Sequence, residues 1–116
     1  MDSNEIIKKE TFEIWEDEEL NLKNNLLRGI FSIGFENPSP IQKKSIIPLI
    51  NGKDLVAQAQ SGTGKTGAFT IGLLQKINED KKTTQAIIIT PTRELATQIF
   101  NVITQSRFIG GYLKFL

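Results

Sequence analysis

Residues 59–66 read Ala59-Gln60-Ser61-Gly62-Thr63-Gly64-Lys65-Thr66, a glycine-rich segment that ends in lysine and threonine. Glycines allow backbone conformations that are closed to residues with a side chain, so successive backbone amides in this segment can turn toward one anion. Lys65 would then reach the β- and γ-phosphates of a nucleotide, and the Thr66 hydroxyl would hold magnesium. The segment predicts a phosphate loop, although Ala59 stands where the strict pattern has its first glycine.

The segments on either side give this loop the context that a phosphate loop requires. Residues 54–58 read as a buried strand, and apolar residues after the loop recur near helical spacing, at Phe69, Ile71, Leu73, Leu74 and Ile77. A Gly-Thr-Gly turn before a helix, with an exposed lysine, is the alternative interpretation. The order of strand, loop and helix favours nucleotide binding, because the helix start adds its positive dipole end.

Composition limits the remaining chemistry. The chain has 116 residues, 39% of them hydrophobic and 23% charged, which is ordinary for one soluble domain. Its net charge of +1 is low for a protein that holds nucleic acid by bulk charge, so any such binding must rely on local geometry. The absence of Cys and His excludes disulfides, thiol chemistry and imidazole bases. Without a long apolar run or signal peptide, we expect no membrane partner and a cytoplasmic or nuclear location.

The part of the chain before residue 34 divides into an extension and a helix. Residues 1–19 are polar and turn acidic, and we expect them to form a partly ordered N-terminal extension to a domain at 20–116. Residues 23–33 carry one apolar stripe, and Gly34 offers a left-handed C-terminal cap. The stripe predicts a helix that packs against the rest of the domain.

Further helices and strands are predicted on both sides of the phosphate loop. Ser39 as N-cap and Pro40 in the first helical position begin a helix before the loop. After it, residues 86–90 form a continuous β-branched run, which is typical of a strand covered on both faces. A helix is predicted at 93–105, and a third strand begins at 112–116.

Alternating strands and helices around a phosphate loop predict an α/β fold, with a parallel sheet, flanking helices and right-handed crossovers. Only three strands are predicted, and the last of them stands at the end of the sequence. Because such a sheet is small for this architecture, we expect the chain to be part of a larger domain, truncated after the third strand begins.

Three sequence blocks occur in a fixed order along the chain. They are Gly34-Phe35 with Pro38-Ser39-Pro40-Ile41-Gln42, then residues 59–66, and then Pro91-Thr92-Arg93-Glu94-Leu95-Ala96. Together they resemble the Q motif, motif I and motif Ia of the DEAD-box RNA helicases, most closely the eukaryotic initiation factor 4A type. The resemblance covers about residues 20–111. It implies the N-terminal part of a first RecA-like domain, ATP and magnesium as cofactors, and ATP hydrolysis coupled to RNA duplex unwinding. It also implies RNA and translation or RNA-processing factors as partners.

The resemblance assigns Phe35 to stacking on adenine and Gln42 to pairing with adenine N6 and N7. An amide offers one donor and one acceptor in a plane, which matches adenine and presents the wrong pattern to guanine. The alternative for Gln42 is a capping box, in which its side chain turns back to the Ser39 amide.

The third block implies contacts of Pro91, Thr92 and Arg93 with the RNA backbone. Amides at a helix start and a hydroxyl suit phosphate, and such contacts carry no sequence information. In the alternative interpretation Thr92 only caps the helix and Arg93 pairs with a nearby carboxylate.

Two features depart from the family pattern. Asp17 stands where the family usually has an aromatic residue, and the nearest candidates for that role are Trp15 and Phe12. The Asp-Glu-Ala-Asp motif and the second domain are not in this sequence, so we expect binding without turnover. A non-catalytic truncated interaction fragment, and a P-loop ATPase or DNA helicase with no RNA role, are the alternative functions.

Overall fold

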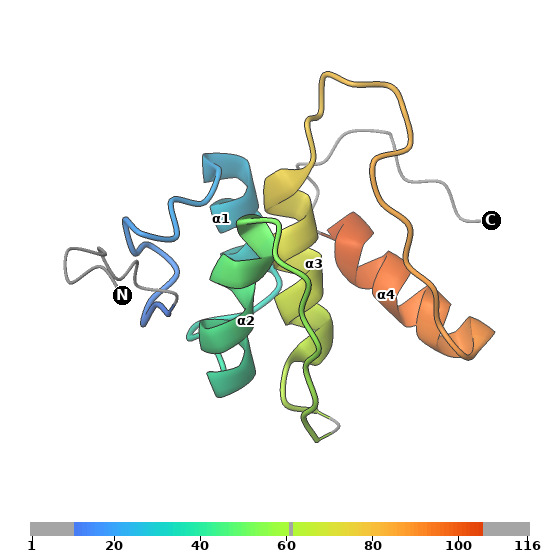
Figure 1. Cartoon of the computed structure of the whole chain (residues 1–116), viewed down its shortest axis with the longest axis horizontal. Helices are drawn as coiled ribbons and strands as arrows, with labels where there is room; N and C mark the ends of the chain where they lie inside the picture. Colours follow the sequence, from blue (N-terminus) through green and yellow to red (C-terminus); the bar gives the residue numbers. More distant parts are fainter. Residues whose placement is uncertain (1–10, 61, 106–116) are drawn as a thin grey trace, which may run out of the picture.

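The computed structural model describes residues 11–60 and 62–105. Its helices are α1 (Asn24–Ser32), α2 (Pro40–Ile50), α3 (Lys65–Lys76) and α4 (Arg93–Gln105). The central helix is α3, which packs against α2 and α1 on one side and α4 on the other (Figure 1). None of the described helices is long and apolar enough to cross a membrane.

The predicted helix boundaries follow from local capping. α1 ends at a turn in which Gly34 has φ +86° and donates its N–H to Phe31 O at 3.1 Å, while the Phe35 N–H donates to Ile30 O at 3.2 Å. This crossing pair of bonds satisfies carbonyls at the helix end, as expected for a left-handed glycine cap. α2 begins at Pro40, where proline costs no helix hydrogen bond.

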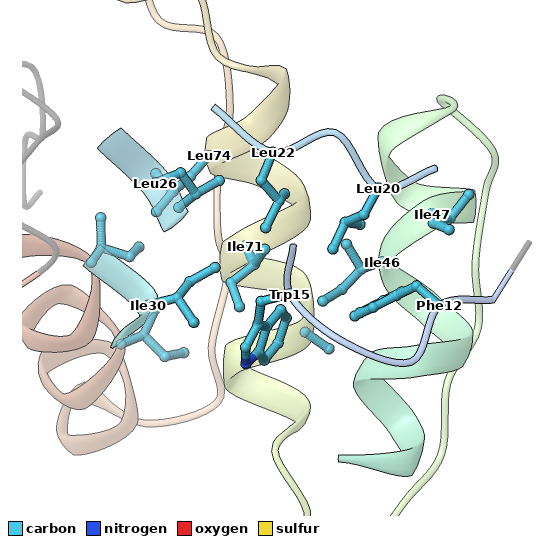
Figure 2. Close-up of a cluster of buried hydrophobic side chains, with 13 residues drawn as sticks. Phe12, Trp15, Leu20, Leu22, Leu26, Ile30, Ile46, Ile47, Ile71 and Leu74 are labelled. Carbon is cyan, nitrogen blue, oxygen red and sulfur yellow. The ribbon is translucent and has the colours of Figure 1, made fainter. Parts of the chain in front are cut away.

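A single hydrophobic cluster holds α1, α2 and α3 together. Figure 2 shows Phe12 beside Ile46 of α2, and Trp15 beside Ile71 of α3. The Phe12 and Trp15 side chains are 0% and 1% exposed, and their ring centroids lie 5.6 Å apart. The hydrophobic core therefore includes residues on the N-terminal side of the predicted boundary at residue 20. Residues 1–10 lie outside the described part of the chain.

The segment before α1 also holds the C-terminal end of α3. The backbone N–H of Lys23 donates to Gln75 Oε1 at 2.9 Å, and Gln75 Nε2 donates to Asn21 O at 3.1 Å. The Lys23 ammonium donates to the carbonyls of Leu74 and Ile77, and it pairs with Glu79 at 3.1 Å. A cation at the C-terminal end of a helix interacts favourably with the negative end of the helix dipole. These contacts therefore fix the end of α3 that lies away from the phosphate loop.

The predicted strands at 54–58 and 86–90 are not confirmed, because no strand is present among residues 11–60 and 62–105. Strands need a neighbouring backbone for their ladder of hydrogen bonds, and no backbone bond joins these two segments to each other. Ile87 and Ile89 are 79% and 90% exposed, and Val56 is 100% exposed. The predicted third strand at 112–116 lies outside the described residues.

Candidate nucleotide site

The phosphate loop connects the irregular segment 54–58 to α3. Gly62 has φ +81° and Gly64 has φ +95°, so both glycines take the left-handed conformation that the sequence predicts for a loop of inward-turned amides. Gly64 is the N-cap of α3, and its carbonyl accepts the Ala68 N–H at 3.0 Å. The helix therefore starts inside the motif, with its dipole end at the loop.

Side chains of the loop form bonds within the loop. The Lys65 ammonium donates to Ala59 O, and the Thr63 N–H and hydroxyl both donate to Gln60 O, at 3.3 and 2.6 Å. The Thr66 hydroxyl oxygen is of the kind that magnesium prefers, so the loop fits a magnesium–nucleotide complex. Ser61, the remaining predicted loop residue, lies outside the described residues.

Gln42 joins the second block to this loop. The side-chain Oε1 of Gln42 accepts the Ser39 backbone N–H at 2.8 Å. The Gln42 backbone N–H donates to Ser39 Oγ at 3.4 Å, so the capping box is formed. The other end of the same amide, Nε2, donates to Gly64 O at 3.3 Å. The Gln42 side chain is 4% exposed. The cap and the contact with the phosphate loop are therefore made by one side chain at the same time.

Phe35 lies at the same junction. A Cβ atom added to Gly67 of α3 would be 2.9 Å from Phe35 Cε2, so the ring edge points at the first turn of the helix. Phe35 and Gln42 thus meet the phosphate-loop helix together. Gly67 was not predicted as a site residue, although a glycine inside a predicted helix is a signal of close packing.

The residues of the third block lie at the start of α4. Pro91, Thr92 and Arg93 are all exposed. The Leu95 N–H donates to Thr92 Oγ1 at 3.2 Å, so Thr92 does cap the helix. Arg93 forms no ion pair with a carboxylate among the described residues, so the alternative prediction of a carboxylate partner is not supported. In Figure 1 the starts of α3 and α4 both lie in the lower part of the view.

The upstream aromatic residues do not line the site. Phe12 and Trp15 point into the core between α2 and α3, where Figure 2 shows them among aliphatic side chains. Because both aromatic side chains are buried in the core, packing alone accounts for them, and no role in base stacking is needed.

A glycine loop at the start of a helix, with its lysine, its threonine and an amide on the loop carbonyl, defines a P-loop nucleotide-binding protein. The DEAD/DEAH box helicase family matches residues 39–114. This chain belongs to that family.

Related proteins agree with this assignment. The chain is 58% identical over 101 residues to the ATP-dependent RNA helicase eIF4A of Candida albicans, covering 87% of this chain and 25% of that protein. It is similar in structure to a DEAD box protein from Methanococcus jannaschii, with a TM-score of 0.76, 42% identity, and coverage of 84% and 26%. Saccharomyces cerevisiae Dbp5 bound to RNA and ADP BeF3 gives a TM-score of 0.72, 41% identity, and coverage of 78% and 24%.

These relatives are RecA-like helicases, so the fold class of the domain is supported, although residues 11–60 and 62–105 contain no strand of its sheet. The chain spans about a quarter of the length of the relatives that it matches. The comparisons do not favour the alternatives of an interaction fragment or a P-loop ATPase without an RNA role.

Proposed function

We propose that this chain binds ATP with magnesium, as part of a protein that couples ATP hydrolysis to the opening of RNA duplexes. The observation that carries the proposal is the bond from Gln42 Nε2 to Gly64 O at 3.3 Å. It joins the side chain suited to adenine directly to the loop suited to phosphate. One nucleotide could therefore contact both.

Nucleotide binding requires the loop to exchange its internal bonds for bonds to phosphate. Lys65 would leave Ala59 O for the β- and γ-phosphates, where its charge has more favourable partners than a neutral carbonyl. The Thr66 hydroxyl would hold magnesium, which neutralises charge on the phosphates when bound. The N-terminal end of α3 would add its dipole at the same point.

Base recognition would use the amide that now caps α2. To pair with adenine, Gln42 must give up its bonds to Ser39 N and Gly64 O, or share them. The bond to Gly64 O holds the amide beside the phosphate loop, where the base of a loop-bound nucleotide would be within its reach. Phe35 would supply a ring face for the base.

RNA would be held at the start of α4. Arg93 is exposed and without an ion pair in the described residues, and the helix start presents backbone amides. Such groups bind phosphate without reading bases, so the contact would be independent of RNA sequence. Saccharomyces cerevisiae Dbp5, which is similar in structure, is bound to RNA.

Titration calorimetry with ATP and GTP tests the proposal. We expect Gln42→Ala to reduce the preference for ATP, since an unpaired base edge costs about 1–3 kcal/mol. Lys65→Ala should remove most triphosphate affinity and leave the helical circular dichroism unchanged, because an exposed loop lysine contributes little to stability. Lys44→Ala, an exposed lysine of α2, is the control and should bind as the unmodified chain does. Equal affinities for ATP and GTP in the unmodified chain would contradict the adenine assignment.

A further inference from the structure

The amide nitrogen of Gln42 lies in a notch between two glycines. A Cβ atom built on Gly64 would be 2.7 Å from Gln42 Nε2, and a Cβ atom built on Gly67 would also be 2.7 Å from it. Real Cβ atoms essentially never come so close to another atom. A side chain at either position would therefore force the end of the Gln42 side chain to shift.

The two glycines differ in what else they do. Gly64 has φ +95°, so its backbone conformation alone favours glycine. Gly67 lies inside α3 and has no such φ, and glycine is among the least favourable residues in a helix interior. Its conformation gives no reason for glycine, and the reason must lie in the space that it leaves.

That space is occupied by the two side chains assigned to adenine. A Cβ atom on Gly67 would meet Gln42 Nε2 at 2.7 Å and Phe35 Cε2 at 2.9 Å. The other buried glycine of α3, Gly72, leaves room instead for Leu49, whose Cβ would lie 3.0 Å away. Gly72 serves the packing of α2 on α3, whereas Gly67 faces the proposed base site.

We propose that Gly67 is a positioning residue for base discrimination, a role that rests on the proposed function. By leaving the notch open, it seats the Gln42 amide against the loop and sets where that amide and the Phe35 ring meet a base. A side chain at position 67 would displace the ends of both side chains. Its nearest contacts from outside α3 would be with Gln42 and Phe35, the two side chains assigned to adenine, so the part of the ligand affected is the base of a purine nucleotide.

The test is the ratio of ATP to GTP affinity, measured by titration calorimetry on the whole chain. Gly67→Ala should lower this ratio by about threefold to tenfold, the effect of losing one hydrogen bond, with GTP affinity unchanged. Gly72→Ala is the matched control, because it makes the same change in the same helix, and it should keep the ratio of the unmodified chain. In a Gln42→Ala background, Gly67→Ala should change the ratio no further, because its effect passes through that amide.

The possible outcomes distinguish a failure of this inference from a failure of the proposed function. If Gln42→Ala abolishes the ATP preference and Gly67→Ala retains it, the inference is wrong and the proposed function stands. If the unmodified chain has no ATP preference, both are wrong.

Should Gly67→Ala fail to fold, the double variant Gln42→Asn with Gly67→Ala decides the question. The shorter amide removes the contact with Gln42 and leaves the contact with Phe35 Cε2, so this variant should match the ratio of ATP to GTP affinity of Gln42→Asn alone. A different ratio would overturn the inference. Failure to fold would place the limiting contact at Phe35 and would overturn it too.

Discussion

Replacement of Trp15 by alanine tests whether the residues before position 20 belong to the folded domain. Trp15 is 1% exposed and packs against Phe12, with ring centroids 5.6 Å apart. Truncating a buried Trp costs about 3–5 kcal/mol, and losing the aromatic pair costs about 0.5–1.5 kcal/mol more. The indole Nε1 has no hydrogen-bond partner among the described residues, so its removal returns about 1–3 kcal/mol.

The expected net effect is a loss of about 3 kcal/mol in the free energy of unfolding, or roughly 10–20 °C in the melting temperature of a chain this size. Melting followed by circular dichroism at 222 nm measures it. Ile14→Ala, one residue away and 52% exposed, is the matched control and should cost less than about 0.5 kcal/mol. Trp15→Phe removes the unpartnered N–H but keeps a ring, so we expect it to lose less than Trp15→Ala. A loss below about 0.5 kcal/mol for Trp15→Ala, as small as that of Ile14→Ala, would show that this segment does not stabilise the domain.

Four other substitutions probe three separate parts of the chain. Gly64→Ala should weaken binding of both ATP and GTP in calorimetry, because its φ of +95° strains any residue with a side chain. The loss should be larger for ATP, because the new Cβ would also meet Gln42. Unchanged affinities would refute the loop geometry. Lys23→Met should lower the melting temperature by a few degrees, because it removes the ammonium group from the C-terminal end of α3. It should leave nucleotide affinity unchanged, and an altered affinity would contradict a purely structural role. Arg93→Ala should weaken RNA binding equally for all RNA sequences and reduce the salt dependence of binding, and a sequence-dependent loss would argue against a backbone contact. Thr92→Ala should also lower the stability of α4 by about 1 kcal/mol, because it removes the cap.

The sequence was sufficient wherever the structure depends on neighbours along the chain. The cap at Gly34, the start of α2 at Ser39 and the start of α3 at Gly64 each depend on residues within one helical turn. Gln42 shows the limit of such reasoning. Capping and adenine pairing were posed as alternatives for this side chain. The structure shows the cap at one end of the amide, and it shows at the other end a contact with the phosphate loop that the sequence did not indicate, because the loop lies beside the start of α2.

Contacts between distant residues could not be predicted in the same way. The bond from Lys23 to Gln75 spans 52 positions, and no local pattern indicates it. The burial of Trp15 was missed because acidic residues surround it in the sequence, and a single turn of chain carries no periodicity. Glycine inside the α3 pattern was the available signal for Gly67, and its meaning required the positions of Phe35 and Gln42.

The unconfirmed strands bear differently on the two proposed binding sites. Ile87 and Ile89 read as buried residues of a sheet, yet they are 79% and 90% exposed, and a cavity of about 670 Å³ lies between their segment and α3. The described residues therefore leave this segment without the neighbours that a buried strand needs. Pro91 to Arg93 continue directly from it, so the position of the proposed RNA contact depends on how that segment is covered. The nucleotide site does not share this dependence, because Gln42 and the phosphate loop lie where α2 packs against α3. Nucleotide binding should consequently need only the packed helices, whereas RNA binding should also need whatever covers residues 86–90.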